Sequence, residues 1–357
     1  MRLLLLALAC CAAAQDREPK PQPANAAVIR AFDTHNIVMF GEWHACTQEH
    51  EWLRAFVSTP EFADRVDDIV VEFGNSLYQK SIDRYITGEA VPFEQAQQAW
   101  RNVAGAVGPP SPVYEAFFKA VRAANLKRKG KHPLRVVLGD PYADWDKIQD
   151  REDLGPFVAN RDSWYAQVVK DEVLAKNHRA LLIMGWGHFL RRNGPGAIEQ
   201  QLRAAGAKTY LVVFGTNAVG GYDDLDKRFD SWPLPALADL HDGGWVGDLP
   251  AMPVLMGGTA PANAMKLKDV ADALLYVAPR DALTQLFMPR SELEGTAYGK
   301  EIARRYKIQT GGDIDFARSL DEAPAFERPR PASGGPRPLG APPKSFRDPL
   351  PPRPPSK

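Results

Sequence analysis

The stretch that decides the fold is Asn36-Ile37-Val38-Met39-Phe40-Gly41-Glu42-Trp43-His44. Its apolar run ends at a glycine, which is typical of a buried β-strand. Residues 47–57 follow, with Trp52, Leu53 and Phe56 at helical spacing. A buried strand followed by a helix is the unit from which parallel sheets are built.

The same unit recurs along the chain. Apolar runs predict further strands at 68–73, 134–140, 180–184 and 209–214, and amphipathic stretches predict helices at 77–86, 93–125 (broken near 108–110), 164–176 and 198–205. We therefore predict an α/β fold with a mainly parallel central sheet and helices on both faces. Loops should dominate 215–262, where Gly, Pro and Asp are frequent, while 270–277 and 298–306 add helices or strands to the same domain. We place this single domain at 26–320.

The composition narrows the class of protein. The chain has 357 residues with 44 Lys+Arg and 44 Asp+Glu, and this balance gives no reason to expect nucleic acid as a partner. Hydrophobic residues make up 45% and charged residues 25%, which excludes a wholly disordered chain and a polytopic membrane protein. The 3 cysteines are too few for a disulfide scaffold.

The N-terminus has the order of an export signal. Arg2 is followed by the apolar run 3–9 and by the small residues Ala12-Ala13-Ala14. We predict a signal peptide at 1–14 that is cleaved after Ala14, with lipid modification of Cys10 as the alternative. Either route makes the protein exported, and thus periplasmic or extracellular.

The C-terminal segment 324–357 is predicted to be a disordered, proline-rich, basic tail. Proline lacks the amide donor that helices and central strands need, and this segment holds twelve of the 31 prolines. Its net charge is +5, which leaves −6 on residues 15–323. This tail and an N-terminal lipid are the two candidates for an envelope contact. The acidic body slightly favours a cationic ligand or a metal.

Ionisable side chains gather where the predicted strands end, which is where open parallel sheets bind their ligands. These side chains are Glu42, His44, Glu72, Asp140 and His188. Arg161 opens a helix from which its guanidinium can reach the same rim. Each residue has an ordinary explanation by itself, such as Asp140 capping the helix that follows. Two histidines and several carboxylates at corresponding strand ends nevertheless indicate a functional site.

Missing motifs exclude other mechanisms. The chain has no Gly-x-Ser-x-Gly elbow and no Gly-Lys-Ser/Thr phosphate loop. His50 lacks the second histidine, four residues on, that a zincin requires. Cys46 is either a nucleophile beside His44 or a small core thiol, and we favour the core thiol.

The order of these motifs resembles the erythromycin esterase/ChaN/Tiki superfamily. Four features over residues 30–215 carry the resemblance: Gly41-Glu42-Trp43-His44, a strand ending in Glu72, Arg161-Asp162, and a strand running into Gly185-Trp186-Gly187-His188. The chain departs from the esterases in having Ala45 where they carry a second histidine, and it lacks the large helical insertions of macrolide esterases.

The resemblance implies three kinds of activity. Esterase-like members use a histidine as general base on water without a metal. Tiki-like members resemble metal-dependent peptidases, which here implies a divalent metal held by Glu42, His44, Glu72 and His188. ChaN-like members bind haem or iron, and Trp43 and Trp186 beside the two histidines are candidates to line such a cleft.

We interpret the chain as an exported hydrolase of ester or amide bonds in a small-molecule or peptide substrate. His44 is the leading general base and Glu42 orients it, His188 and Glu72 complete the base or metal shell, and Arg161 steadies an oxyanion or a substrate carboxylate. The alternatives are a haem- or metal-binding protein without turnover and an envelope interaction protein that acts through its tail.

Overall fold

A computed structural model of the chain describes residues 17–105, 110–128, 132–189, 191, 198–215, 227–229, 231–256, 264–279, 282–316 and 322–324. The predicted signal peptide, Cys10 and nearly all of the predicted tail lie outside the described residues. In the part that is described, no helix combines the length and the apolar character needed to cross a bilayer.

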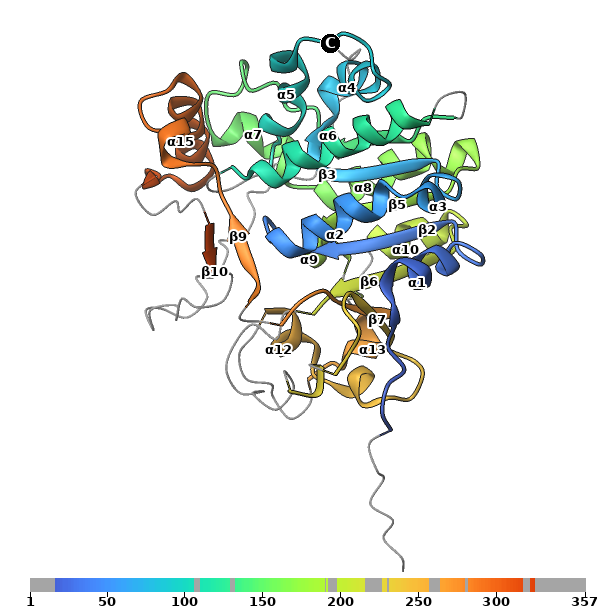
Figure 1. Cartoon of the computed structure of the whole chain (residues 1–357). Coiled ribbons are helices and arrows are strands. Elements are labelled where there is room, and N and C mark those ends of the chain that lie inside the picture. The colour runs from blue at the N-terminus through green and yellow to red at the C-terminus, as the bar shows by residue number, and fades with distance from the viewer. Residues whose placement is uncertain are drawn as a thin grey trace, which may run out of the picture.

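The centre of the protein is an eight-stranded sheet (Figure 1). In sheet order its strands are β1 (Gln22–Pro23), β7 (Ala236–Asp239), β8 (Ala273–Tyr276), β6 (Thr209–Phe214), β2 (Ile37–Glu42), β5 (Ala180–Gly185), β3 (Asp68–Asn75) and β4 (Arg135–Asp140). The strands from β8 to β4 run parallel, whereas β7 is antiparallel to both β8 and β1. The predicted α/β fold with a mainly parallel sheet is confirmed.

All five predicted strands are present, with small differences at their ends. β2 continues two residues past the predicted apolar run and includes Glu42. β3 runs on to Asn75, so Glu72 lies inside the strand and does not end it. The register between β3 and β4 shifts between Val71 and Asn75, close to this glutamate.

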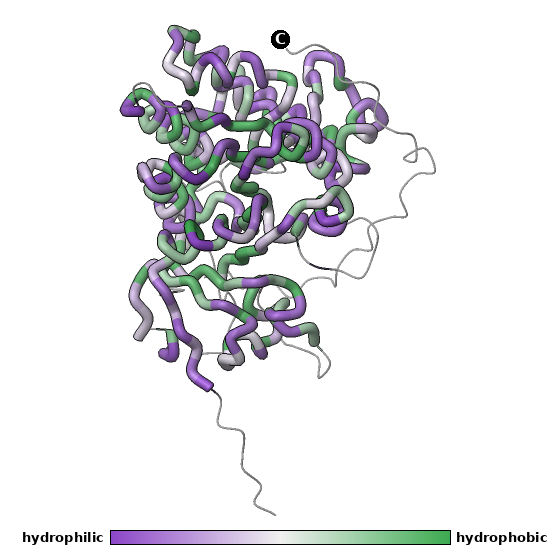
Figure 2. Tube along the Cα trace, turned by 90° about the vertical axis from the view of Figure 1, so that its right-hand side faces the viewer, coloured by the Kyte–Doolittle hydropathy of each residue, from purple (hydrophilic) through white to green (hydrophobic). Residues whose placement is uncertain are grey.

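Alternate residues of the central strand enter two different hydrophobic clusters, as expected for a strand that is buried on both sides. Ile37 and Met39 pack in one cluster, which also contains Tyr165 of α8 (Arg161–Glu172) and Leu202 of α10 (Ile198–Ala204). Val38 and Phe40 pack in the other, with residues of α2 (Thr47–Val57) and α6 (Pro112–Lys127). Hydrophilic and hydrophobic residues alternate along the helices (Figure 2), which fits helices that bury one face.

The remaining elements surround this frame. The other helices are α1 (Ala24–Ala31), α3 (Pro60–Ala63), α4 (Gln79–Ile86), α5 (Phe93–Arg101), α7 (Arg151–Val158), α9 (Trp186–Phe189), α12 (Ala251–Met256), α13 (Leu267–Val270), α14 (Arg290–Leu293) and α15 (Ala297–Thr310). The predicted break within 93–125 is the gap between α5 and α6, where Ser111 caps α6 and Pro112 opens it.

The C-terminal part of the body is where sequence patterns are least informative. Of the predicted additions, 270–277 supplies β8 and 298–306 lies within α15. The loop-rich segment 215–262 contains β7 in its described part, so the prediction there was incomplete. β9 (Thr284–Leu286) and β10 (Glu322–Pro324) form a separate two-stranded sheet near α15 (Figure 1).

The edge strand β4 is covered by a side chain instead of another strand. The Gln79 amide donates to the carbonyl of Val136 at 2.8 Å and accepts from the N–H of Leu138 at 2.7 Å. Gln79 is buried, so removing its amide leaves two buried backbone groups without a partner.

We expect Gln79→Ala to lower the free energy of unfolding by about 1–3 kcal/mol, the usual range for orphaned buried polar groups. Urea denaturation measures this. Gln95→Ala is the control, because Gln95 is exposed and its amide donates to the Ser81 hydroxyl and not to a strand backbone. Equal effects of the two substitutions would contradict the edge-pairing role.

Candidate active site

Four adjacent parallel strands bring the predicted site residues together. In the order β2, β5, β3, β4, these strands contribute Glu42, Gly185, Glu72 and Asp140 at or near their C-terminal ends. His44 follows β2, and His188 lies in α9 directly after β5. Contacts between side chains connect the predicted residues into two groups, one around Glu42 and one around Glu72.

The first group is centred on the buried carboxylate of Glu42. Its Oε1 lies 2.7 Å from Nδ1 of His44, and its Oε2 lies 2.7 Å from Nε2 of His50. The contact with His50 is a close approach of two buried polar atoms and not a well-aligned hydrogen bond. The Tyr114 hydroxyl donates to Oε1 at 3.3 Å. The carboxylate is thus held between one imidazole that is 59% exposed and one that is fully buried.

The second group is centred on Glu72. Its Oε1 lies 3.2 Å from Nε2 of His188 and accepts from the Arg161 guanidinium at 3.0 Å. Its Oε2 accepts the Gly185 N–H at 2.6 Å. His188 also contacts Asp162 through Nδ1 at 2.5 Å. Both nitrogens of this histidine are therefore engaged.

Asp140 anchors the guanidinium of Arg161. Its Oδ1 accepts from Arg161 at 3.0 Å and from the Tyr165 hydroxyl at 3.1 Å, and its other oxygen accepts from the N–H of Ala104. The helix-capping explanation of Asp140 is wrong, because Asp150 provides the cap of the next helix, α7. Asp140 is instead fully buried beneath the site.

Local backbone features make room for His44. A Cβ on Gly185 would lie 2.8 Å from Cε1 and Nε2 of the His44 ring, closer than real contacts allow. Ala45 has φ 62°, a left-handed conformation that is uncommon outside glycine and concentrated at functional sites. The loop after β2 is therefore shaped around this imidazole.

Charge pairing shifts the pKa values of the first group. Burial alone would raise the pKa of Glu42, but the neighbouring His50 and His44 outweigh it and lower the pKa to about 2. Partial burial would lower the pKa of His44, but the hydrogen bond and charge of Glu42 raise it to about 9. His44 therefore carries a proton at neutral pH when the pocket holds no ligand.

The second group shows the same balance. Burial opposes ionisation of Glu72, yet His188 and Arg161 hold its pKa well below the ordinary value. Burial would lower the pKa of His188, whereas Asp162 and Glu72 raise it to about 9. Both histidines thus favour the protonated form because carboxylates surround them.

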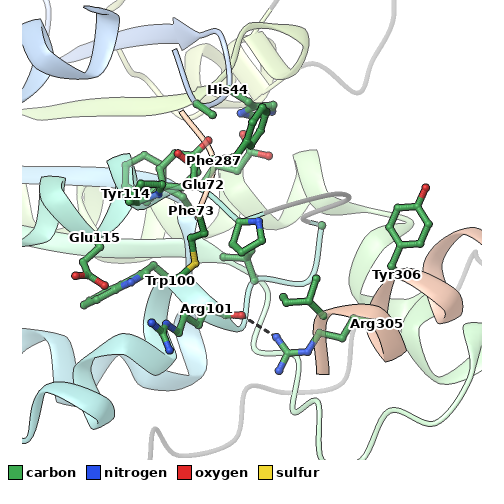
Figure 3. Close-up of a pocket in the computed structure, with 18 of the residues that line it drawn as sticks. His44, Glu72, Phe73, Trp100, Arg101, Tyr114, Glu115, Phe287, Arg305 and Tyr306 are labelled. Atoms are coloured by element: carbon green, nitrogen blue, oxygen red, sulfur yellow. Dashed lines mark hydrogen bonds between the residues drawn. The ribbon is translucent and has the colours of Figure 1, made fainter. Parts of the chain in front are cut away.

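A pocket of about 480 Å³ opens over this rim (Figure 3). Glu42, His44, Glu72 and Arg161 line one part of it. Tyr114 and the segment 285–309, which includes β9, α14 and most of α15, supply much of the remaining wall. This C-terminal wall was not predicted, because nothing in the sequence links residues so far apart.

The donor set does not fit a divalent metal as it stands. Among the described residues, no group of three or more His, Cys, Asp or Glu side chains is arranged around a common metal position. The oxygen and nitrogen atoms of the predicted ligands already contact other groups of the protein. Glu42 contacts two histidines, and Glu72 contacts His188, Arg161 and a backbone N–H. The Arg161 charge on Glu72 further disfavours a cation there.

The prediction that Trp43 and Trp186 line the cleft beside the histidines is wrong. Trp43 packs against the small cluster of Cys46, Phe214 and Leu283, and Trp186 packs against a core cluster of the sheet. The pocket walls include Trp100 instead. Cys46 is fully buried and burial raises the pKa of its thiol, in agreement with a core thiol.

Three contributors were missed or undervalued. His50 was considered only as an incomplete zincin motif, Tyr114 was not singled out, and Asp162 was treated only as a partner of Arg161 at the start of a helix. A signal for His50 existed: it stands on the buried face of α2 with Leu53, three residues on, so a polar group occupies an apolar position. No comparable signal marked Tyr114, whose helix is far from β2 in sequence.

Comparison with known proteins gives structural matches only. No protein-family model matches the sequence, and no curated protein sequence does. A solved succinoglycan biosynthesis protein matches with 10% identity and a TM-score of 0.49, over 73% of this chain and 92% of that chain.

Two further matches concern the predicted resemblance. A mutant of the erythromycin esterase EreC matches with 12% identity and a TM-score of 0.45, over 71% of this chain and 92% of that one. ChaN of Campylobacter jejuni, solved with cofacially bound haem, matches with 11% identity and a TM-score of 0.34, over 56% and 87%. Two of the groups named by the resemblance, the erythromycin esterases and ChaN, are among the matches. Identities this low say nothing about the reaction of this chain.

Gly185→Ala tests the packing of the site. The new Cβ should push the His44 ring away from Glu42, so the pKa of His44 should fall from about 9 toward its ordinary value of 6.5. Gly187→Ala is the matched control, because a Cβ there meets nothing within 4 Å. NMR titration of labelled histidines measures both variants, and an unchanged His44 pKa in Gly185→Ala would contradict the described packing.

Proposed function

We propose that this protein is an exported hydrolase that cleaves ester or amide bonds with water activated by His44. The observation that carries the proposal is the state of the His44 imidazole. Its Nδ1 is held by Glu42, and among the described residues its Nε2 has no hydrogen-bond partner while the ring lines the pocket. This is the arrangement of a general base whose tautomer is set by a carboxylate.

The reaction starts from neutral His44. Nδ1–H donates to Glu42, so the lone pair on Nε2 takes a proton from water as the water oxygen attacks the carbonyl carbon. The carbonyl oxygen becomes an oxyanion. When this intermediate collapses, the bond to the alcohol or amine breaks and the leaving group takes the proton from Nε2.

Arg161 and His188 supply positive charge beside this centre. Arg161 lines the pocket and is fixed by Glu72 and Asp140, so little reorganisation is needed for it to face an oxyanion. His188, with a pKa raised to about 9 by Asp162 and Glu72 against the effect of burial, stays protonated at neutral pH. Buried Glu42 is in turn held by His50 and Tyr114, which we infer are positioning residues for His44.

The substrate is a small molecule or a peptide, and the pocket supports an apolar body because Phe73, Tyr114, Phe287 and Met288 line it. Export is inferred from residues 1–14, and envelope attachment through Cys10 or the tail is inferred from the sequence alone. The haem-binding alternative loses the support that Trp43 and Trp186 were expected to provide.

We expect His44→Ala and His188→Ala to lose turnover by a factor on the order of 10²–10⁴, as general-base and charge-stabilising groups do. Both variants should keep the far-UV and near-UV circular dichroism of the parent. His241→Ala is the control, since the half-exposed His241 ring lies 3.6 Å from Asp272 and is not among the residues that line the pocket.

A panel of aryl esters and anilides, assayed with and without chelator, provides the measurement. Full activity in both histidine variants would refute the proposed roles. Chelator should leave activity intact and elemental analysis should find no stoichiometric metal, because the site atoms already pair with one another. Loss of activity with chelator, or a Soret band in the purified protein, would favour the metal or haem alternatives.

The pH dependence follows from the raised pKa of His44. As the pH rises through about 9, His44 loses its proton and can accept one from water, which gives kcat/KM an acid limb near that value. His188 loses its stabilising proton over the same range, so kcat/KM should reach a maximum near pH 9 and fall above it. Glu42→Gln removes the carboxylate that stabilises the imidazolium, so the limb should move to lower pH while the maximal rate falls. A limb that stays in place would show that another group titrates.

A further inference from the structure

The far end of the pocket presents a cation that the proposed chemistry does not use. Figure 3 shows His44 at one end of the pocket and Arg101, the last residue of α5, at the other. Arg101 lines the pocket and is half-buried. Within the described ranges, no carboxylate lies within ion-pair distance of its guanidinium.

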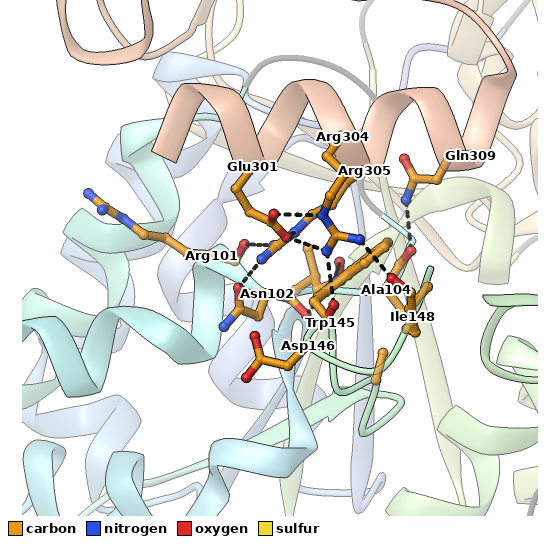
Figure 4. Close-up of polar contacts among 12 residues, drawn as sticks. Arg101, Asn102, Ala104, Trp145, Asp146, Ile148, Glu301, Arg304, Arg305 and Gln309 are labelled. Carbon is orange, nitrogen blue, oxygen red and sulfur yellow. Dashed lines mark hydrogen bonds and ion pairs between the residues drawn. The ribbon is translucent and has the colours of Figure 1, made fainter. Parts of the chain in front are cut away.

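Neighbouring groups hold Arg101 without neutralising it. Its guanidinium lies 4.4 Å from the centre of the Tyr298 ring, and its carbonyl accepts a hydrogen bond from Arg305. Figure 4 shows Arg304 and Arg305 sharing the carboxylate of Glu301, while the Arg101 side chain extends away from them. Glu115 and Glu292 also line the pocket, but among the described residues neither forms an ion pair with the Arg101 guanidinium.

The nearby acid of the wall is already engaged. Glu115 lines the pocket, but its two oxygens contact Lys119 at 2.6 Å and the Gln97 amide at 3.1 Å. Trp100, beside Arg101, is buried, and its indole N–H has no hydrogen-bond partner among the described residues. Two donors at this end thus lack an acceptor among the residues that the structure describes.

Between the two ends the walls are apolar. Phe73 and Phe287 lie between His44 and Arg101 (Figure 3), and Met288 also lines the pocket. A ligand that fills the pocket therefore contacts His44 at one end, apolar side chains along its length and Arg101 at the other end. Arginine binds carboxylates through two parallel N–H donors, and part-burial strengthens that contact.

We propose that Arg101 binds a carboxylate of the substrate, which makes the substrate class an ester or amide whose apolar body ends in a carboxylate. The proposal rests on the proposed function for the reaction at the other end of the pocket. Arg101 is a specificity-determining residue: it recognises the substrate far from the bond that breaks.

Equilibrium binding tests this independently of turnover. The full chain is titrated by calorimetry with phenylbutyrate and with its neutral isostere phenylbutyramide. We expect the carboxylate to bind about tenfold or more tightly than the amide, as for one charge-assisted contact. Arg101→Met, which keeps the apolar stem against Tyr298, should abolish this preference and leave amide binding unchanged.

The controls separate this site from other causes. Arg84→Gln removes the same charge from the surface ion pair with Glu89, outside the pocket, and should retain the preference. No preference in the parent protein, or a preference lost in His44→Ala but kept in Arg101→Met, would overturn the proposal by placing the carboxylate elsewhere. A hydrolase panel without any turnover would refute the proposed function and leave this binding result standing.

Discussion

The site depends on keeping two carboxylates charged where water is largely excluded. Glu42 and Glu72 are both buried near the ends of parallel strands, and an unpaired buried charge is costly. Each is therefore paired with neighbouring side chains: His44 and His50 contact Glu42, and His188 and Arg161 contact Glu72. The contacts with the two carboxylates that make burial tolerable also raise the pKa values of His44 and His188, so stability and reactivity depend on the same contacts.

The sheet order explains how the two groups share a pocket. β5 lies between β2 and β3, and it ends in Gly185, whose missing side chain leaves room for the His44 ring while its N–H binds Glu72. A larger residue there would separate the groups. The helices add a second layer, because Tyr114 of α6 and His50 of α2 reach Glu42 from the face opposite α8.

Features of the fold that leave a local pattern in the sequence were predicted correctly, and features without such a pattern were not. Parallel strands buried on both faces read as continuous apolar runs, so five of the six parallel strands were predicted as strands. Strand ends on adjacent parallel strands must lie at one edge, so Glu42, Glu72, Asp140 and the two histidines could be grouped. The tryptophans were misplaced because the turn after β2 and the start of α9 after β5 place Trp43 and Trp186 against packing clusters, and the direction of a side chain at such a connection leaves no pattern in sequence.

The sequence by itself determined the parallel sheet, the edge at which the chemistry lies, and the residue types available there, because periodicity and strand polarity are local properties. Only the tertiary structure decided which atoms pair. In the folded protein His50 contacts Glu42, and the carboxylate of Glu72 contacts Arg161 and His188. Helix α15 lies beside α5, so that Arg101 faces the pocket with Tyr298. Those pairings join residues up to about two hundred positions apart, and only packing in three dimensions selects such contacts.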